Sequence, residues 1–384
     1  MSPTSSAAAR ANNAVPITLP AKMKTRVLLG MSGGVDSSVA AALLLQQGYE
    51  VIGITMKMWP QDCLDRQQDK ACGPFAMVDA RAVAEQLGFP HYVVDEQAHF
   101  QKIVIDYFVS EYRSGRTPNP CVLCNERVKF GALLDKANAL GADFIATGHY
   151  ARVQSSSSSS SSTDTHSLLL RSREPQKDQT YFLFSLKQDQ LRRCLFPLGD
   201  LNKKQVRTLA ANLKLKVAEK EDSQEICFVP EHDYRRFLRE DGKLTPREGE
   251  IVTRDGRILG RHPGIEYFTI GQRKGLGISA PQPHYVVALE AQTNRVIVGH
   301  PDELMTKEFF VERPNWIAFD SLASSSKCTV KIRSQHTGAP CTIAPTENGR
   351  IRVTLDHPER AITLGQAAVF YDSDLVLGGG WIAL

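Results

Sequence analysis

The sequence lacks long apolar runs and a strong excess of charge of either sign. No stretch of its 384 residues approaches the roughly 20 consecutive apolar residues that a membrane-spanning helix needs, which excludes an integral membrane protein. The formal net charge of +4 is too small to indicate nucleic-acid binding from the overall balance. The hydrophobic fraction of 42% and the charged fraction of 23% are ordinary for a soluble globular protein.

Acidic residues are absent from positions 1–25, which also lack a hydrophobic core long enough for a secretory signal. This composition fits either a transit peptide or a disordered tail. Because Arg10 is the only arginine before position 26, we expect a disordered tail and a cytoplasmic protein. The serine run that begins at residue 155 predicts a flexible surface loop over 155–165.

Cysteine is sparse, and the eight cysteines are spread along the chain. This distribution favours reduced thiols over a disulfide scaffold, so a reactive cysteine must be recognised from its context. Five of them have no informative context and are predicted to be packing or surface residues: Cys63, Cys72, Cys194, Cys328 and Cys341.

The most informative stretch is a glycine-containing turn at residues 30–38. The apolar run before it predicts a buried strand, and the Ala/Leu-rich stretch after it predicts a helix. Gly33 and Gly34 let the backbone approach a ligand closely, and the free amides of the first helical turn attract an anion. No lysine follows the glycines, so this is not the phosphate loop of a phosphoryl-transfer NTPase.

Strands and helices alternate from this turn to about residue 148. The alternation predicts an α/β fold with a doubly wound parallel sheet, whose ligand lies at the carboxyl ends of the strands. From about residue 249 onward, short β-rich segments with hairpin turns follow. We expect a catalytic domain over 26–220, a central linking domain over 221–285 and a C-terminal antiparallel β-barrel over 286–384.

Positive charge is concentrated between Arg171 and Lys220, where 12 Lys/Arg stand against 5 Asp/Glu. Such a segment suits an RNA phosphate backbone. A solvated helical face explains the same pattern equally well.

Two cysteines stand out by context. The prolines of residues 117–120 predict an exposed loop, and Cys124 lies just before a predicted helix that runs to Leu140. At a helix N-terminus the dipole and the free amides lower the pKa of a thiol, so we expect Cys124 to be a nucleophile. Cys227 lies among charged and polar residues, a context in which a cysteine is more often inert than reactive.

The glycine turn resembles the Ser-Gly-Gly-x-Asp-Ser pyrophosphate loop of the N-type ATP pyrophosphatases. Six further segments follow it in the order of one family, and together they resemble the tRNA-specific 2-thiouridylases from about residue 26 to residue 384. These segments are 117–125, 147–151, 177–183, 222–228, 271–277 and 365–371.

This resemblance implies ATP-dependent thiolation of C2 of the wobble uridine in tRNA. The uridine would be adenylated with loss of pyrophosphate, and a persulfide on Cys227 would attack C2. Cys124 would complete sulfur release, with a Cys124 to Cys227 disulfide as product. The implied cofactors are ATP and Mg2+. The implied partners are a tRNA with a wobble uridine and a sulfur donor, such as a cysteine desulfurase or a sulfur-relay protein, with no membrane partner.

The resemblance also assigns residues to ligands, and it implies no metal site formed by protein side chains alone. The expected ATP contacts are Gly30, Met31, Ser32, Gly33, Gly34, Val35, Asp36, Ser37, Met56 and Gly148. The residues expected beside the flipped target base are Asn119, Pro120 and Cys121. The expected tRNA contacts are His149, Lys177, Asp178, Gln179, Arg333, Ser334 and Gln366.

Two alternatives stay open. Cys121, Cys124 and Cys227 would also suit an iron-sulfur cluster that delivers sulfide without a protein persulfide. The ATP chemistry would also serve an AMP-forming ligase acting on a small molecule, which needs neither the paired cysteines nor the positive segment.

Overall fold

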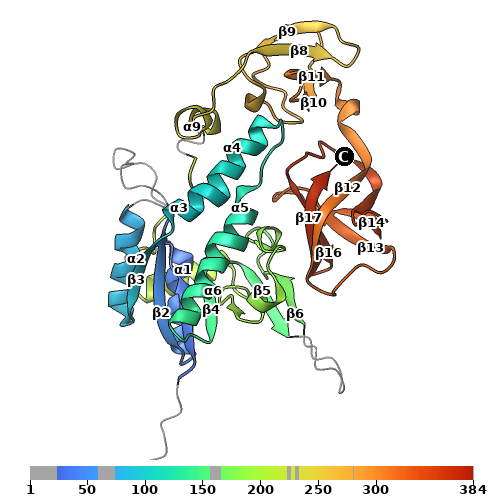
Figure 1. The fold of residues 1–384 in the computed structure, drawn as a ribbon. Helices are drawn as coiled ribbons and strands as arrows, with labels where there is room; N and C mark the ends of the chain where they lie inside the picture. The colour runs from blue at the N-terminus through green and yellow to red at the C-terminus, as the bar shows by residue number, and fades with distance from the viewer. Residues whose placement is uncertain are drawn as a thin grey trace, which may run out of the picture.

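The computed structural model describes residues 24–58, 74–155, 166–222, 226–229, 233–279 and 281–383. The described strands form an N-terminal sheet, a small central sheet and a C-terminal barrel. In Figure 1 the central part, in gold, lies above the other two, and the barrel, in orange and red, lies beside helices α4 and α5. The expected tail as far as residue 23, the expected loop from residue 156 to 165, and Cys63 and Cys72 lie outside the described residues.

The N-terminal sheet is parallel and doubly wound, as predicted. Its order is β3-β2-β1-β4-β7, and every neighbouring pair is parallel. Val27 and Leu29 belong to one hydrophobic core and Leu28 to another, so β1 is buried on both faces. The elements are β1 (Arg26–Gly30), α1 (Val35–Gln46), β2 (Glu50–Lys57), α2 (Pro74–Leu87), β3 (His91–Asp95), β4 (Phe144–Thr147) and β7 (Cys194–Leu195).

Two long helical segments lie between this sheet and the barrel (Figure 1). The first comprises α3 (Gln97–Phe100), a π-helical stretch (Gln101–Ile105) and α4 (Asp106–Arg113). The second comprises α5 (Pro120–Leu123), a π-helical stretch (Cys124–Lys129) and α6 (Phe130–Ala139). Residues at the junctions keep helical backbone angles, so each segment is continuous. The second begins at Pro120 because proline suits the first position of a helix.

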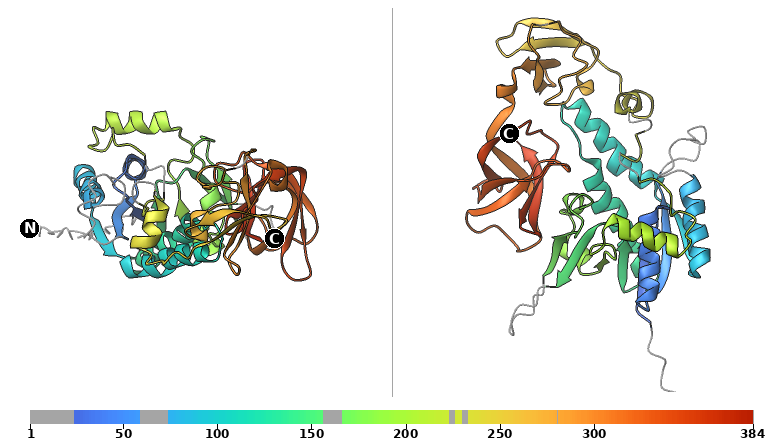
Figure 2. Two further views of the ribbon diagram at one scale, coloured as in Figure 1. Left: turned by 90° about the horizontal axis from the view of Figure 1, so that it is seen from above. Right: turned by 180° about the vertical axis from the view of Figure 1, so that it is seen from behind.

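A hairpin links the α/β part to the barrel. β5 (Ala151–Ser155) pairs with β6 (Ser167–Arg171), and Leu170 of β6 pairs with Leu375 of the C-terminal strand. The α/β part also contains α7 (Gln188–Leu191) and α8 (Lys203–Asn212), and α9 (Tyr234–Glu240) precedes the central sheet. α8 packs on α1, beside which Figure 2 shows it in light green.

The central sheet contains the domain boundary that the sequence analysis expects at residue 286. β8 (Gly249–Thr253) pairs with β9 (Ile258–His262), and β10 (Tyr285–Glu290) pairs with β11 (Arg295–Gly299). β11 also pairs with β8, so both hairpins form one sheet. Residues 285–299 therefore belong to the central sheet and not to the barrel. The turn residues of a hairpin do not reveal which sheet it joins.

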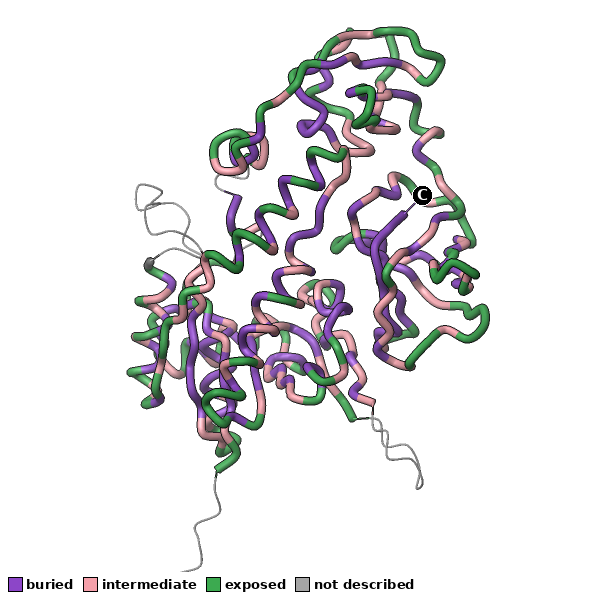
Figure 3. Tube along the Cα trace, viewed as in Figure 1, coloured by how far each residue is buried: buried purple, intermediate pink, exposed green. Residues whose placement is uncertain are grey.

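The C-terminal strands form an antiparallel barrel in the order β12-β15-β14-β13-β16-β17, closed by pairing of β12 with β17. They are β12 (Met305–Trp316), β13 (Ser326–Lys331), β14 (Ala339–Pro345), β15 (Ile351–Arg360), β16 (Ala367–Asp372) and β17 (Leu375–Ala383). Figure 3 shows β17 as an almost continuously buried strand. Tyr181 of the α/β part donates its hydroxyl to Ala367 O of the barrel at 3.0 Å.

A run of glycines lets β17 pack closely against the α/β part. A Cβ at Gly379 would lie 2.7 Å from the Phe184 ring and 2.7 Å from Ala368 O. We predict that Gly379→Ala lowers the free energy of unfolding by about 1–3 kcal/mol, because a methyl group overpacks this contact. Gly131→Ala is the control: it lies within α6 with no close neighbour, and alanine favours a helix by about 1 kcal/mol. Thermal melting that fails to separate the two variants would contradict this account.

Candidate active site

The glycine turn packs tightly on α2 and leaves the start of α1 without a side-chain cap. Gly33 has a φ of +67°, and a Cβ there would lie 2.1 Å from Ala76 O, so the position requires glycine. Gly34 caps α1 with its backbone only. The Ser37 and Ser38 hydroxyls donate to Gly34 O at 3.2 and 2.9 Å and hold the turn in shape. This geometry is suited to an anion.

The other segments expected to bind ATP lie at the same sheet edge. A Cβ at Gly148, after β4, would lie 2.7 Å from Ser37 N, so only glycine allows this contact. Gly30 of β1 pairs with Ile54 of β2, and Met56 lies two residues further toward the carboxyl end. The carboxyl ends of β1, β2 and β4 thus meet at the turn, as the topology predicts.

Asp36 supplies a carboxylate to this crevice. Its Oδ1 accepts hydrogen bonds from Tyr150 Oη at 2.9 Å and from Lys203 Nζ at 2.7 Å. Lys220 Nζ donates to Gly33 O at 3.1 Å and to Asp79 Oδ2 at 2.7 Å. Two lysines that are distant in sequence therefore lie beside the glycine turn, where their charge suits phosphate groups.

Asp222 forms ion pairs with three cationic side chains next to the glycine turn. Its carboxylate lies 2.7 Å from Lys177 Nζ, 2.7 Å from Lys203 Nζ and 3.1 Å from an Arg207 terminal nitrogen. Burial alone would raise the pKa of Asp222, but hydrogen bonds from Lys177 and Lys203 hold it below its usual value. Four cations of the positive segment thus form hydrogen bonds within the protein: Lys177, Lys203, Arg207 and Lys220. Neither interpretation of that segment anticipates this arrangement.

Cys121 and Cys124, on the second helical segment, are less exposed to solvent than Cys227. Only 6% of Cys124 is exposed, Cys121 is half-buried and Cys227 is exposed. Burial raises the pKa of Cys124 to about 11 and that of Cys121 to about 12. The lowered pKa expected for Cys124 is wrong for this structure, because the helix begins at Pro120 and Cys124 lies inside it. Cys227 is close enough for its charge to raise both values further.

Lys129 is a residue that the sequence analysis missed. After burial, its charge is the next largest influence on the pKa of Cys124, which it lowers, and it lowers the pKa of Cys121 as well. Burial lowers the pKa of His149 to about 3, with a further contribution from Lys129, so this imidazole is neutral. Lys129 follows Cys121 by eight residues, a spacing that places both on one helix face and could have revealed it.

Most of the residues expected to contact tRNA are engaged within the protein. Gln179 Oε1 accepts from Tyr150 N at 2.9 Å, and Asp178 accepts from the Thr180 hydroxyl at 2.9 Å. His149 Nδ1 lies 2.6 Å from Thr147 Oγ1. Arg333 and Ser334 are exposed on the barrel.

The loop expected to hold the target base is held in place by hydrogen bonds from a barrel residue. Asn119 and Pro120 are buried where α5 begins. Gln366 Nε2 donates to Thr117 O at 3.1 Å and to Pro118 O at 3.0 Å. Gln366, expected to contact tRNA, therefore positions this loop.

In the described part of the chain, no three His, Cys, Asp or Glu side chains form a group that could hold a metal ion. Cys121, Cys124 and Cys227 thus do not adopt the arrangement of cluster ligands. No helix among the described residues is long and apolar enough to cross a membrane.

A parallel sheet with this glycine turn at its carboxyl edge, followed by two β-structured parts, defines an enzyme of the N-type ATP pyrophosphatase class. Residues 25–231 match a family model described as a tRNA methyl transferase HUP domain. Residues 235–300 match a tRNA methyl transferase PRC-barrel domain, and residues 306–382 match an aminomethyltransferase beta-barrel domain.

Curated relatives match nearly the whole chain. The tRNA-specific 2-thiouridylase MnmA of Geobacter metallireducens is 49% identical over 94% of this chain and 97% of that protein. The protein of the same name from Symbiobacterium thermophilum is 49% identical over 93% and 92%. The chain belongs to the family of tRNA-specific 2-thiouridylases. A solved NMN synthetase from Francisella tularensis aligns with a TM-score of 0.32 and 20% identity over 51% of this chain and 66% of that one, too distant a likeness to inform function.

We predict that iodoacetamide labels Cys227 far faster than Cys124 in the ligand-free protein at pH 8. Cys227 is exposed, whereas a pKa of about 11 leaves only about one Cys124 thiol in a thousand ionised. Lys129→Met should slow Cys124 labelling further, since loss of the cation raises the pKa of the thiol. Lys136→Met, on the same helical segment, is the control and should leave the rate unchanged. Peptide-resolved mass spectrometry measures each site, and equal rates at Cys124 and Cys227 would refute the assigned burial.

Proposed function

We propose that this chain uses ATP to replace the C2 oxygen of a wobble uridine in tRNA with sulfur. The curated relatives are named for this product and match the chain almost from end to end. The observation that carries the proposal is a pyrophosphate-type glycine turn linked to buried and exposed thiols: Gly148 contacts the turn, and Lys129 acts on both His149 and the thiols of the second helical segment. The turn serves activation of the uridine oxygen, and the thiols serve sulfur transfer.

In the first half-reaction the uridine C2 oxygen attacks the α-phosphorus of ATP and pyrophosphate leaves. The glycine turn and the uncapped start of α1 would hold the phosphates, and Lys203 and Lys220 would neutralise the charge of the leaving pyrophosphate. Asp36 would contribute a carboxylate to Mg2+, which binds through one or two carboxylates together with substrate phosphates, in place of its hydrogen bonds from Lys203. Bound there, Mg2+ would neutralise phosphate charge.

In the second half-reaction the outer sulfur of a Cys227 persulfide attacks C2, and AMP leaves with the former uridine oxygen. The Cys124 thiolate then attacks the Cys227 sulfur, which breaks the sulfur-sulfur bond and leaves the outer sulfur on C2. The products are 2-thiouridine and a Cys124 to Cys227 disulfide, which an external thiol must reduce before the next turnover. Exposure of Cys227 suits sulfur loading by a donor protein, and burial of Cys124 protects the resolving thiol.

The competing functions lack comparable support. Methyl transfer, which the family model's description mentions, requires neither a pyrophosphate turn nor paired thiols. The small-molecule ligase and the cluster-dependent thiolase are not favoured by the named relatives or by the arrangement of the three thiols. A cysteine desulfurase or a sulfur-relay protein would supply the sulfur, in the cytoplasm where the thiols stay reduced.

We predict that nucleoside mass spectrometry detects 2-thiouridine when unmodified tRNA is incubated with the protein, ATP, Mg2+, a thiol reductant, and a cysteine desulfurase with free cysteine as the donor of persulfide sulfur to Cys227. Cys124→Ser and Cys227→Ser should each abolish the product, since each removes a sulfur that the exchange step needs. Cys328→Ser, a half-buried barrel cysteine, is the matched control and should retain activity.

A Cys121→Ser variant separates the two sulfur mechanisms. Retained thiolation by a colourless, metal-free preparation supports the persulfide. Loss of thiolation together with loss of visible absorbance from anaerobically purified protein would establish the cluster instead. An inactive wild-type protein that still binds tRNA would overturn the proposed reaction.

We predict that Lys203→Met lowers kcat/KM for ATP by about 10- to 1,000-fold, because a charge-assisted contact to the leaving group is lost. Lys204→Met, the exposed neighbour on α8, should change it less than about twofold. Pyrophosphate release at saturating tRNA is the readout, with thermal melting as the check on folding. An unchanged kcat/KM in Lys203→Met would remove this lysine from the ATP site.

A further inference from the structure

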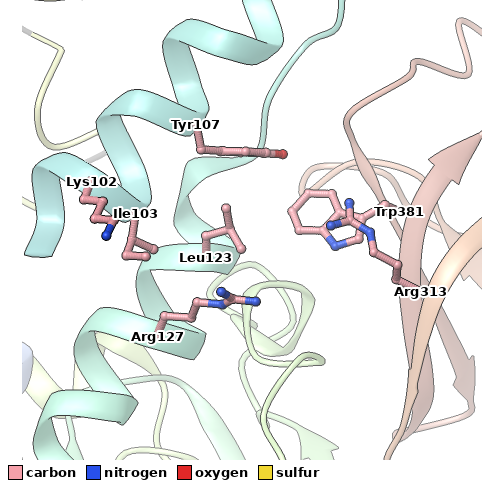
Figure 4. Close-up of a pocket in the computed structure, with 7 residues that line it drawn as sticks. All are labelled: Lys102, Ile103, Tyr107, Leu123, Arg127, Arg313 and Trp381. Atoms are coloured by element: carbon pink, nitrogen blue, oxygen red, sulfur yellow. The ribbon is translucent and has the colours of Figure 1, made fainter.

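A cavity of about 210 Å³ lies where the α/β part meets the barrel. Figure 4 shows Tyr107 and Leu123 pointing from the helical segments toward Trp381 and Arg313 of the barrel, with Arg127 reaching into the same gap. The cavity is smaller than the roughly 300–1,000 Å³ of typical small-molecule pockets, so it suits one flat group and not a whole nucleotide cofactor.

Two aromatic rings frame this cavity. The Tyr107 and Trp381 ring centroids lie 6.0 Å apart with planes inclined by 60°. Trp381 is 9% exposed and packs in a core, which fixes its ring, and Tyr107 is partly buried. Rigid aromatic rings of this kind are what unpaired nucleobases stack on.

The charge of the cavity wall is wholly positive. Its lining includes Lys102, Arg127 and Arg313 and no acidic residue. Arg313 lies over the Trp381 ring, with its guanidinium carbon 5.5 Å from the centroid. Within the described residues no ion pair to an acid is found for Arg313, whereas Arg127 Nε donates to Glu126 Oε1 at 3.4 Å. The Arg313 guanidinium, which has no such partner, suits phosphate oxygens, and Arg127 adds a second positive charge beside it.

The backbone of the barrel is distorted to place Arg313 here. The pairing of β12 with β17 shifts register between Glu312 and Asn315, and Arg313 has a φ of +49°, uncommon for a residue other than glycine. Bulges of this kind redirect side chains next to functional sites. The close approach of Arg313 to Trp381 is thus built into the strand.

The cavity borders the thiol site without containing it. Leu123 and Arg127 are four residues apart on the helical segment that carries Cys124, and they line the cavity on one helix face. None of Cys121, Cys124 and Cys227 lines it. A base bound here would therefore lie beside the reacting uridine and out of reach of its sulfur chemistry.

We propose that this cavity binds an unpaired nucleobase of the tRNA anticodon loop that is adjacent to the target uridine, with Tyr107 and Trp381 contacting the base and Arg127 and Arg313 its phosphate. The proposal rests on the proposed function for its choice of RNA. It gives the enzyme a contact by which the neighbour of the wobble uridine contributes to substrate selection.

The test measures binding of hairpin RNAs by fluorescence anisotropy at fixed salt. One hairpin has an intact anticodon loop with a wobble uridine, and two others have an abasic nucleotide immediately 5′ or 3′ of it. One abasic hairpin should bind the wild-type protein about 5- to 100-fold more weakly, the range of one base stacked on an aromatic side chain. In Tyr107→Leu the difference in binding between intact and abasic hairpins should be smaller than in the wild type, because one of the two aromatic partners of the base is gone.

Arg313→Gln should weaken all hairpins and make the salt dependence of binding shallower by about one charge. Lys327→Gln removes a cation from the exposed start of β13, across the barrel from β12, and should preserve the difference between hairpins. The proposal would be overturned if the wild-type protein bound all three hairpins with equal affinity. It would also be overturned if the abasic nucleotide weakened binding to Tyr107→Leu by the same factor as binding to the wild type. If either of these results were obtained while the wild-type protein still thiolated intact tRNA, the proposed function would stand and only the base-binding cavity would be rejected. If no hairpin bound at all, both proposals would be rejected.

Discussion

The close approach of Gly148 to the first turn of α1 is the constraint that organises this enzyme. No side chain fits between position 148 and Ser37, so the end of β4 lies directly on the glycine turn. The next residue, His149, is already within the influence of Lys129, whose charge also acts on the two helix thiols. The proposed ATP and sulfur sites are therefore adjacent at the end of one strand.

Electrostatics gives the two halves of the site opposite character. Around the glycine turn, lysines and aspartates are paired at 2.7 Å, so phosphate groups would enter a network that is already charged and ordered. Around Cys121 and Cys124, burial keeps the thiols protonated, and Lys129 counteracts it only in part. Cys124, the proposed resolving thiol, is thus poorly reactive until its surroundings change, whereas Cys227 is exposed.

Much of this arrangement could be predicted from the sequence, because it depends on local chemistry. Gly33 and Gly34 mark the turn, and alternating elements predict the parallel sheet that is observed. The environment of Cys124 could not be predicted in the same way, because the helix start at Pro120 and the burial of the thiol depend on tertiary packing. Lys203 and Lys220 reach the turn across more than 160 residues, a distance over which spacing gives no signal. The position of the hairpin of residues 285–299 could not be predicted either, since the residues of its turn do not indicate which sheet it joins.

The pairing of the β5–β6 hairpin with β17 has a mechanical consequence. Together with the hydrogen bonds of Gln366 and Tyr181, it ties the last two strands of the barrel, β16 and β17, to the α/β part. Parts joined only by a linker would close around a substrate by hinging, whereas these share a sheet and a core. The α/β part and the barrel are thus held in one frame. In the proposed complex, an anticodon loop would therefore have to unstack in order to reach the cavity between them.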